Sequence, residues 1–193
     1  MAAPKIVVFA GSIRTGSINE KLARAAARSL AAAGAEVTHI SLRDYPLPLY
    51  DAELQARDGV PDSARRLVDL FLEHQGAFVA SPEYNASFTP LLKNAFDWMS
   101  RINIEGRPPL PAFKQRVFAL GAVSNGALGG YRGLTQLRAM MELGLGALVL
   151  PDMVAVGNAA EAFSEDGGLT APRTSAFLDE VVRKLVHHAG ALA

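Results

Sequence analysis

Short apolar segments alternate with helical patterns along the chain, and this alternation constrains the fold more than any other feature. The apolar segments predict strands over Lys5–Ala10, Glu36–Ser41, Gly76–Ser81, Arg116–Ala122 and Ala147–Val156. The helical patterns predict helices over Asn19–Ala33, Asp62–Gln75, Phe88–Arg101, Gly130–Leu143 and Thr174–Ala189. Continuous apolar strands between helices are typical of a parallel sheet covered on both faces. Because crossovers between parallel strands are right-handed, we expect an α/β fold, a doubly wound five-stranded parallel sheet in a three-layer αβα sandwich.

The helical segments carry apolar stripes, and no linker interrupts the pattern. Residues of a core-facing stripe lie three or four positions apart, as do Leu67, Leu70, Phe71 and His74, and also Phe177, Val181 and Leu185. The stretches Asp44–Asp51 and Ser164–Pro172 are interpreted as surface connections rather than domain boundaries. A chain of 193 residues can bury a full core. We therefore expect a single domain over residues 1–193.

Composition excludes several classes of function. Lys plus Arg equals Asp plus Glu, at 19 each, which argues against nucleic acid or an anionic membrane as the main partner. The chain has no cysteine, so thiolate nucleophiles, disulfides and cysteine-ligated metals are excluded, and any redox chemistry must come from a cofactor. There is no apolar run of membrane-spanning length, and the segment after Met1 lacks the apolar region of a signal peptide. These features predict a cytoplasmic protein.

The segment Gly11–Asn19 joins the first predicted strand to the first predicted helix. Such a loop presents free backbone N–H groups and the positive end of a helix dipole, which together favour an anion such as phosphate. Arg14 adds a positive charge, while Ser12 and Ser17 add hydroxyl groups. The segment contains neither a P-loop Gly-Lys-Ser/Thr nor the Gly-x-Gly-x-x-Gly of dinucleotide folds. The alternative interpretation is an ordinary strand-to-helix turn with a capping Ser or Asn.

Two further loops follow the third and fourth predicted strands. In Ser81–Ser87, Pro82 stiffens the turn, so that the N–H groups of Glu83, Tyr84 and Asn85 can face one flat polar ring edge, with Tyr84 as an aromatic wall. In Ser124–Gly130, three glycines permit a close approach of the backbone to a planar ligand. A turn followed by a helix start is the alternative explanation for these glycines. For Gly130 alone, this alternative is the better one. Because ligands bind at the carboxyl ends of such strands, the three loops together predict a ligand with a phosphate and a flat polar ring.

Three motifs carry a resemblance to a known family. They are Gly11-Ser12-x-Arg14-x-Gly16-Ser17-x-Asn19, Ser81-Pro82-Glu83-Tyr84-Asn85-x-Ser87 and Leu92-Lys93-Asn94-Ala95-Phe96-Asp97-Trp98. From about Lys5 to Val156 the chain resembles the NADPH-dependent FMN reductase family, flavodoxin-like proteins that include azo-, quinone- and chromate-reductase types. The resemblance implies FMN and NADPH (or NADH) as cofactors.

The resemblance also implies roles for individual residues. The FMN phosphate is expected at Ser12, Arg14, Ser17 and Asn19, and the isoalloxazine at Pro82, Glu83, Tyr84 and Asn85, with Ser124, Gly126, Gly129 and Gly130 on its other side. Asn94, Asp97 and Trp98 are expected to pack helices and contact another subunit. The chain departs from the family at Asn125, where many relatives carry proline, and at Thr89-Pro90, where Pro-Gly is common. These departures bear on nicotinamide access and on the entrance for the electron acceptor, and they remove no phosphate or ring-edge contact.

Other polar residues carry weaker signals. The histidines at 39, 74, 187 and 188 match no metal spacing, so no metal is expected. Lys93 and Asp97 are interpreted as a surface ion pair. Neither Ser12 nor Ser124 has a recognisable His/Asp partner, so a hydrolase triad finds no support. Three interpretations are open for Arg101, Tyr131 and Arg132. They bind a cofactor phosphate, they bridge subunits, or they lie at helix ends in contact with solvent.

We therefore expect an oxidoreductase that takes a hydride from NADPH or NADH through FMN and passes electrons to a small acceptor: a quinone, free flavin, azo compound or chromate-like ion. No catalytic acid or base is expected. A flavodoxin-type electron carrier without its own NAD(P)H turnover is the alternative, although such carriers lean acidic, and a nucleotide sensor is a second one. A homodimer or homotetramer is expected, because Phe88, Phe96, Trp98 and Met99 form an apolar run beside the predicted crevice.

Overall fold

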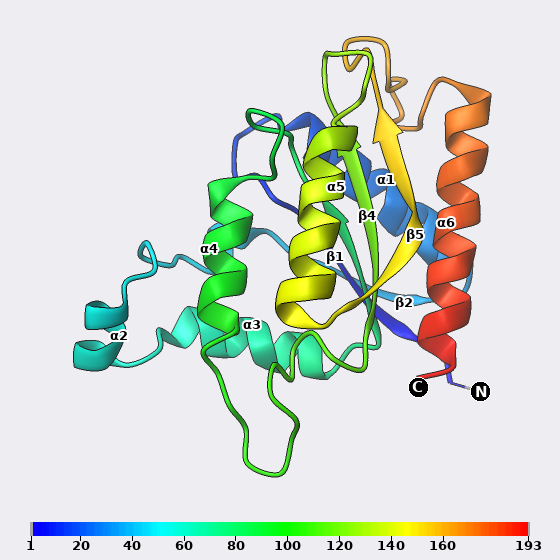
Figure 1. The fold of residues 1–193 in the computed structure, drawn as a ribbon. Helices are drawn as coiled ribbons and strands as arrows, with labels where there is room; N and C mark the ends of the chain where they lie inside the picture. The colour runs from blue at the N-terminus through cyan, green and yellow to red at the C-terminus, as the bar shows by residue number, and fades with distance from the viewer. Residues whose placement is uncertain (1, 193) are drawn as a thin grey trace.

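The computed structural model describes residues 2–192, which form a parallel sheet with helices on both faces (Figure 1). The strands are β1 (Lys5–Ala10), β2 (Glu36–His39), β3 (Gly76–Ala80), β4 (Val117–Val123) and β5 (Leu148–Val156), in the spatial order β2-β1-β3-β4-β5. All neighbouring pairs are parallel. The predicted fold class is confirmed. Residues 1 and 193 of the predicted domain lie outside the described residues.

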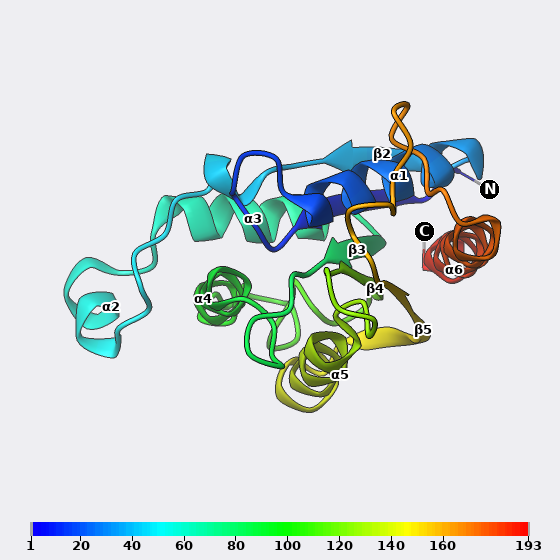
Figure 2. The same ribbon diagram turned by 90° about the horizontal axis from the view of Figure 1, so that it is seen from above.

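The helices form the two outer layers. α1 (Ile18–Ala32) and α6 (Pro172–Gly190) pack on one face of the sheet, and α3 (Asp62–Leu72), α4 (Pro90–Met99) and α5 (Tyr131–Ala139) pack on the other. Seen from above in Figure 2, β4 and β5 lie between α5 and α6. The short helix α2 (Ala52–Asp58) stands apart from the sheet (Figures 1 and 2).

Two separate apolar clusters form the core because successive side chains of a strand point to opposite faces. In β1, Val7 and Phe9 belong to the cluster under α3, α4 and α5, whereas Ile6 and Val8 belong to the cluster under α1 and α6. All these side chains are buried. This two-sided burial explains why the strands are continuous apolar runs in the sequence.

Several element boundaries differ from the sequence prediction. The strand predicted to reach Ser41 ends at His39, because the Ser41 hydroxyl accepts a hydrogen bond from Arg43 N and starts a 3₁₀ turn. α3 ends at Leu72, three residues early, whereas β3 begins at Gly76 as predicted and ends at Ala80, one residue early. The predicted helix 130–143 is α5 followed by a wider π-type turn over Met140–Gly144. These shifts leave the layer structure unchanged.

The sequence prediction missed α2. Its start is capped by Asp51, whose carboxylate accepts hydrogen bonds from Glu53 N at 2.7 Å and Leu54 N at 2.8 Å. None of its seven residues, all within the described chain, is buried. Without a core-facing stripe, the helix has no apolar periodicity by which a sequence pattern could reveal it.

The apolar run cited for subunit contact is mostly core. Phe96, Trp98 and Met99 are at most 1% exposed within this chain. The Trp98 indole Nε1 donates to the Pro48 carbonyl at 2.8 Å, so this side chain holds the segment before α2 against α4. The argument from this run to an oligomer is therefore wrong, and the oligomeric state stays a prediction.

The sheet order places the functional loops. The chain passes from β1 outward to β2 and then returns to β3 on the other side of β1, so the strand order reverses between β1 and β3. Loops at such a point diverge and leave room for a ligand at the carboxyl ends of the strands. Among the described residues, no helix has the length and apolar character needed to cross a membrane.

Candidate functional site

The loop after β1 leads into α1 without a side-chain cap. Ser17 occupies the N-cap position and is buried, yet its hydroxyl makes no capping hydrogen bond among the described residues. By contrast, the side chain of Thr89 caps α4, and that of Asp51 caps α2. The first-turn N–H groups of α1 are therefore left for another acceptor, at the positive end of a 15-residue helix.

Two arginines flank this loop. The Arg14 side chain is exposed and makes one long contact, from Nη1 to the Thr15 carbonyl at 3.4 Å. The Arg43 guanidinium, from the segment after β2, donates to the Ile13 carbonyl and holds the loop in place. Gly16 has a φ of +71°, which glycine adopts without strain. The loop is fixed by Arg43, while the charge of Arg14 stays available to an anion.

Asn19 joins the start of α1 to the end of β4. Its buried side-chain amide donates to the Val123 carbonyl at 3.0 Å and accepts from Val123 N at 2.9 Å. Both amide groups are thus used by protein backbone. Asn19 lines the site through its position, and a phosphate beside it has the backbone N–H groups of the helix start as donors.

The loop after β3 closes on itself as a tight turn. Tyr84 N donates to the Ser87 carbonyl at 2.8 Å, and Ser87 N donates back to the Tyr84 carbonyl at 3.0 Å. Between them, Asn85 and Ala86 have positive φ values of 51° and 64°, as in the type I′ turns of hairpins. The expectation that three consecutive N–H groups face a ligand is therefore wrong for Tyr84, because Ser87 already accepts its hydrogen bond. The Tyr84 side chain is 52% exposed.

Glu83 ties this loop to α5. Its carboxylate accepts hydrogen bonds from the Arg132 guanidinium, with Nε at 2.9 Å, and from Gly133 N at 3.1 Å. Burial works to raise the pKa of Glu83, but the hydrogen bonds from Arg132 and Gly133 outweigh it and hold that pKa below its ordinary value. Arg132 is consequently paired within the chain. The side chain of Glu83 supports the loop, which leaves only its backbone to meet a ligand.

The glycines after β4 have different surroundings. Gly129 has a φ of +60°, and a Cβ there would lie 2.5 Å from Val156 N in β5. Gly130 has a φ of +88°, and a Cβ there would lie 2.6 Å from the Ala122 Cβ. Both glycines let the loop pack on the sheet, as the turn interpretation of the sequence proposed for Gly130. Gly126 is exposed and has open space around it.

The three loops meet around a cavity of about 230 Å³. Of the residues expected at the site, eight line it: Ser12, Arg14, Ser17, Asn19, Pro82, Glu83, Tyr84 and Ser124. Four others, Asn85, Gly126, Gly129 and Gly130, belong to the same loops but do not line it. Ile18 and Val123 line it and were not expected to, whereas Asn125 lines it as a residue that the sequence already linked to nicotinamide access. Ile18 lies between two expected residues and Val123 ends a strand, so their positions in the sequence could have indicated them.

The departure at Thr89-Pro90 has a structural role at the edge of the site. The buried Thr89 hydroxyl donates to the Gly11 carbonyl at 2.7 Å and accepts from Leu92 N at 3.3 Å. Pro90 occupies the first turn of α4, where its missing N–H is not needed. Thr89 therefore fixes the start of α4 against the end of β1.

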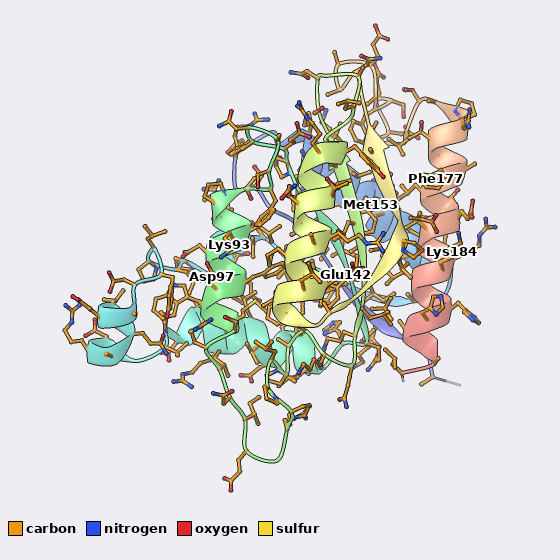
Figure 3. The ribbon with its side chains drawn as sticks, in the orientation of Figure 1. Lys93, Asp97, Glu142, Met153, Phe177 and Lys184 are labelled. Atoms are coloured by element: carbon orange, nitrogen blue, oxygen red, sulfur yellow. The ribbon has the colours of Figure 1, made fainter. Side chains whose placement is uncertain are left out.

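Other polar residues are engaged elsewhere. Lys93 and Asp97 form the predicted ion pair at 2.7 Å, one turn apart on α4 (Figure 3). The Arg101 guanidinium lies over the Tyr50 ring, 5.4 Å from its centroid. His74 is buried, with Nδ1 2.6 Å from the Leu70 carbonyl and Nε2 2.7 Å from the Thr38 hydroxyl. Within residues 2–192 no cluster of His, Asp and Glu could hold a metal ion.

The donors at the cavity fit a flavin mononucleotide. The uncapped start of α1, the free charge of Arg14 and the Ser12 and Ser17 hydroxyls suit a phosphate. The half-buried Pro82 and the exposed Tyr84 ring offer apolar surface for a flat ring system. Within one cavity the site thus combines an anion end and a ring end.

Comparison with known proteins finds reductases of one family. The family model for NADPH-dependent FMN reductase matches residues 4–161. A quinone reductase of Escherichia coli K12 is 34% identical over 141 residues, covering 71% of this chain and 69% of that protein. A quinone reductase of Pseudomonas putida KT2440 is 31% identical over 178 residues, covering 90% of each. Among solved structures, FerB, a flavoenzyme NAD(P)H:(acceptor) oxidoreductase from Paracoccus denitrificans, has a TM-score of 0.80 at 26% identity and 98% coverage of both chains.

Proposed function

Since the chain belongs to the NADPH-dependent FMN reductase family and is an oxidoreductase that uses FMN and NAD(P)H, we propose that its acceptor is a quinone and that the three-loop cavity holds the FMN. The observation that carries the location is the convergence of Ser12, Pro82 and Ser124 on one cavity. The acceptor class is supported by the relatives from E. coli and P. putida, which are quinone reductases.

We assign each part of the cavity a task. The Arg14 guanidinium and the first-turn N–H groups of α1 bind the phosphate, since both are positive and neither has a strong partner in the chain. The Tyr84 ring and Pro82 border the flavin ring. The side chains of Asn19 and Glu83 hold the loops in place and do not bind the flavin themselves. Asn19 ties α1 to β4, and Glu83 ties the β3 loop to α5.

FMN, when bound, supplies the redox chemistry by accepting a hydride from NAD(P)H and passing two electrons to the acceptor. The chain binds and orients the reactants and needs no acid or base of its own for the hydride step. The predicted site residues contain no ionisable pair poised for proton transfer, because the Glu83 carboxylate is held by Arg132 and Gly133. Its lowered pKa keeps that carboxyl ionised at neutral pH.

We predict ping-pong kinetics. One set of loops borders the cavity proposed for FMN, so nicotinamide and quinone are left to use the same exposed face of the bound flavin in turn. Steady-state rates measured over a grid of NADPH and quinone concentrations should give parallel double-reciprocal lines. Intersecting lines would show that both substrates bind together and would contradict a shared site.

We also propose that the protein is a homo-oligomer. The support is a set of exposed apolar residues on the loops after β3 and β4 and at the start of α5, with Leu128 at 58%, Tyr84 at 52% and Tyr131 at 48% exposure. Light scattering at micromolar concentration should give twice or four times the 20.5 kDa chain mass. A monomer mass together with full activity would refute this proposal.

A further inference from the structure

A second cavity, of about 220 Å³, lies under the segment that follows β2. We call it the apolar annex; its walls include Leu42, Tyr45, Leu47, Leu91 and Ala95. A dry apolar cavity of about 150 Å³ is large enough to bind benzene. The annex therefore has room for a ring or a short alkyl chain.

Two polar side chains at the annex, Asn94 and Arg43, have partners in the protein. Asn94 Nδ2 donates to the Pro48 carbonyl at 2.9 Å, and its Oδ1 accepts from Tyr50 N at 2.8 Å. The Arg43 guanidinium donates to the Ile13 carbonyl. A trapped water needs two to four polar partners, and these walls offer few. The annex suits an apolar occupant better than water or a polar ligand.

A third cavity of about 250 Å³, which we call the connecting cavity, shares lining residues with both the flavin cavity and the annex. This connecting cavity shares Ser12, Arg14 and Tyr84 with the flavin cavity. It shares Ile13 and Leu91 with the annex. The Ile13 side chain is 41% exposed, so it presents apolar surface along this path. A molecule whose ring lies at the Tyr84 end can thus extend an apolar tail past Ile13 and Leu91.

We propose that the annex binds the aliphatic side chain of the quinone, so that this enzyme selects alkyl-substituted quinones over the bare ring. The proposal rests on the proposed function for its quinone ring. Each methylene moved from water into an apolar site raises affinity about fourfold. Burial of two or three methylenes therefore predicts a preference of about fifteen- to sixtyfold.

The first test compares two acceptors with one ring, 2,3-dimethoxy-5-methylbenzoquinone with and without a decyl chain at the remaining position. Leu47→Trp and Ala95→Leu fill the annex, and Leu49→Trp is the matched control, because Leu49 is in the same segment but 80% exposed. The wild-type kcat/KM should be about fifteen- to sixtyfold higher for the decyl quinone than for the quinone without the chain. The ratio of the two values should fall toward one in a filling variant that keeps its FMN content and melting temperature, and stay unchanged in Leu49→Trp.

The second test measures binding without turnover. Calorimetry of the FMN-loaded protein uses two probes that accept no electrons, 1,4-dimethoxybenzene and its 2-hexyl derivative. The hexyl probe should bind wild type at least tenfold more tightly than the parent, and filling variants should lose that difference.

Three results overturn the proposal. If wild type turns over both quinones at equal rates and binds both probes with equal affinity, the annex does not bind the side chain. Quinone turnover would still be observed, so the proposed function would stand. A higher KM for NADPH in the filling variants with an unchanged quinone ratio assigns the annex to the nucleotide. NADPH oxidation that no quinone accelerates refutes the proposed function itself.

Discussion

Replacing Gly129 by alanine should destabilise the protein by about 3 kcal/mol or more. A Cβ at this position would lie 2.5 Å from Val156 N and 2.8 Å from the Ala155 carbonyl carbon, both in the backbone of β5. The backbone φ of +60° adds a further penalty of about 1–2 kcal/mol for a residue with a side chain. Thermal or denaturant unfolding measures the change, and FMN titration should show weaker binding because the loop borders the cavity.

Gly126→Ala is the matched control for this prediction. It lies three residues earlier in the same loop, where a Cβ would have its nearest neighbour, the Ser124 Oγ, at 3.9 Å. Its stability should change by less than about 0.5 kcal/mol. Equal stability of the two variants would mean that the loop does not pack on β5 as described.

Arg14→Ala should weaken FMN binding by about ten- to a hundredfold, because a hydrogen bond to a charged group contributes about 1.5–3 kcal/mol. Riboflavin binding should stay nearly unchanged, since riboflavin has no phosphate to lose. Equilibrium titration of both flavins into apoprotein measures the difference. The residue suits this test because its guanidinium makes only one long contact, at 3.4 Å, so its removal costs little stability.

Arg24→Ala controls for a general loss of positive charge. Arg24 is exposed on α1 and pairs with Glu20 at 3.0 Å, one turn past the proposed phosphate position. Its removal should leave FMN affinity within about twofold of wild type. Equal losses for FMN and riboflavin in Arg14→Ala would place Arg14 away from the phosphate.

The fold could be predicted because it depends on patterns that the sequence repeats. Strands such as β1 are buried on both faces and therefore read as apolar runs, and long helices such as α6 carry a stripe that includes Val181 and Leu185. Helix α2 could not be predicted in this way, since it is stabilised by the Asp51 cap rather than by burial. Likewise, no pattern distinguished an exposed Trp98 from one buried against Pro48, because that depends on a segment 50 residues away.

The sequence could predict which loops form the site, but it predicted less well which polar groups in those loops are available to a ligand. The carboxyl ends of parallel strands meet at one edge, which brings Ser12, Pro82 and Ser124 together. Which groups already have partners depends on contacts between distant residues, such as Asn19 with Val123 and Glu83 with Arg132. The turn that uses Tyr84 N is local, but it relies on positive φ values at Asn85 and Ala86, which Ala rarely adopts.

The most direct test of the account is anaerobic rapid mixing of the FMN-loaded protein with excess NADPH, without an acceptor. If the cavity lined by Arg14, Pro82 and Ser124 presents FMN to nicotinamide, the absorbance of oxidised flavin should disappear in a single phase that consumes one NADPH per flavin. Addition of a quinone should then restore it. An absorbance that persists until a separate reductase is added would contradict the account and identify the protein as an electron carrier.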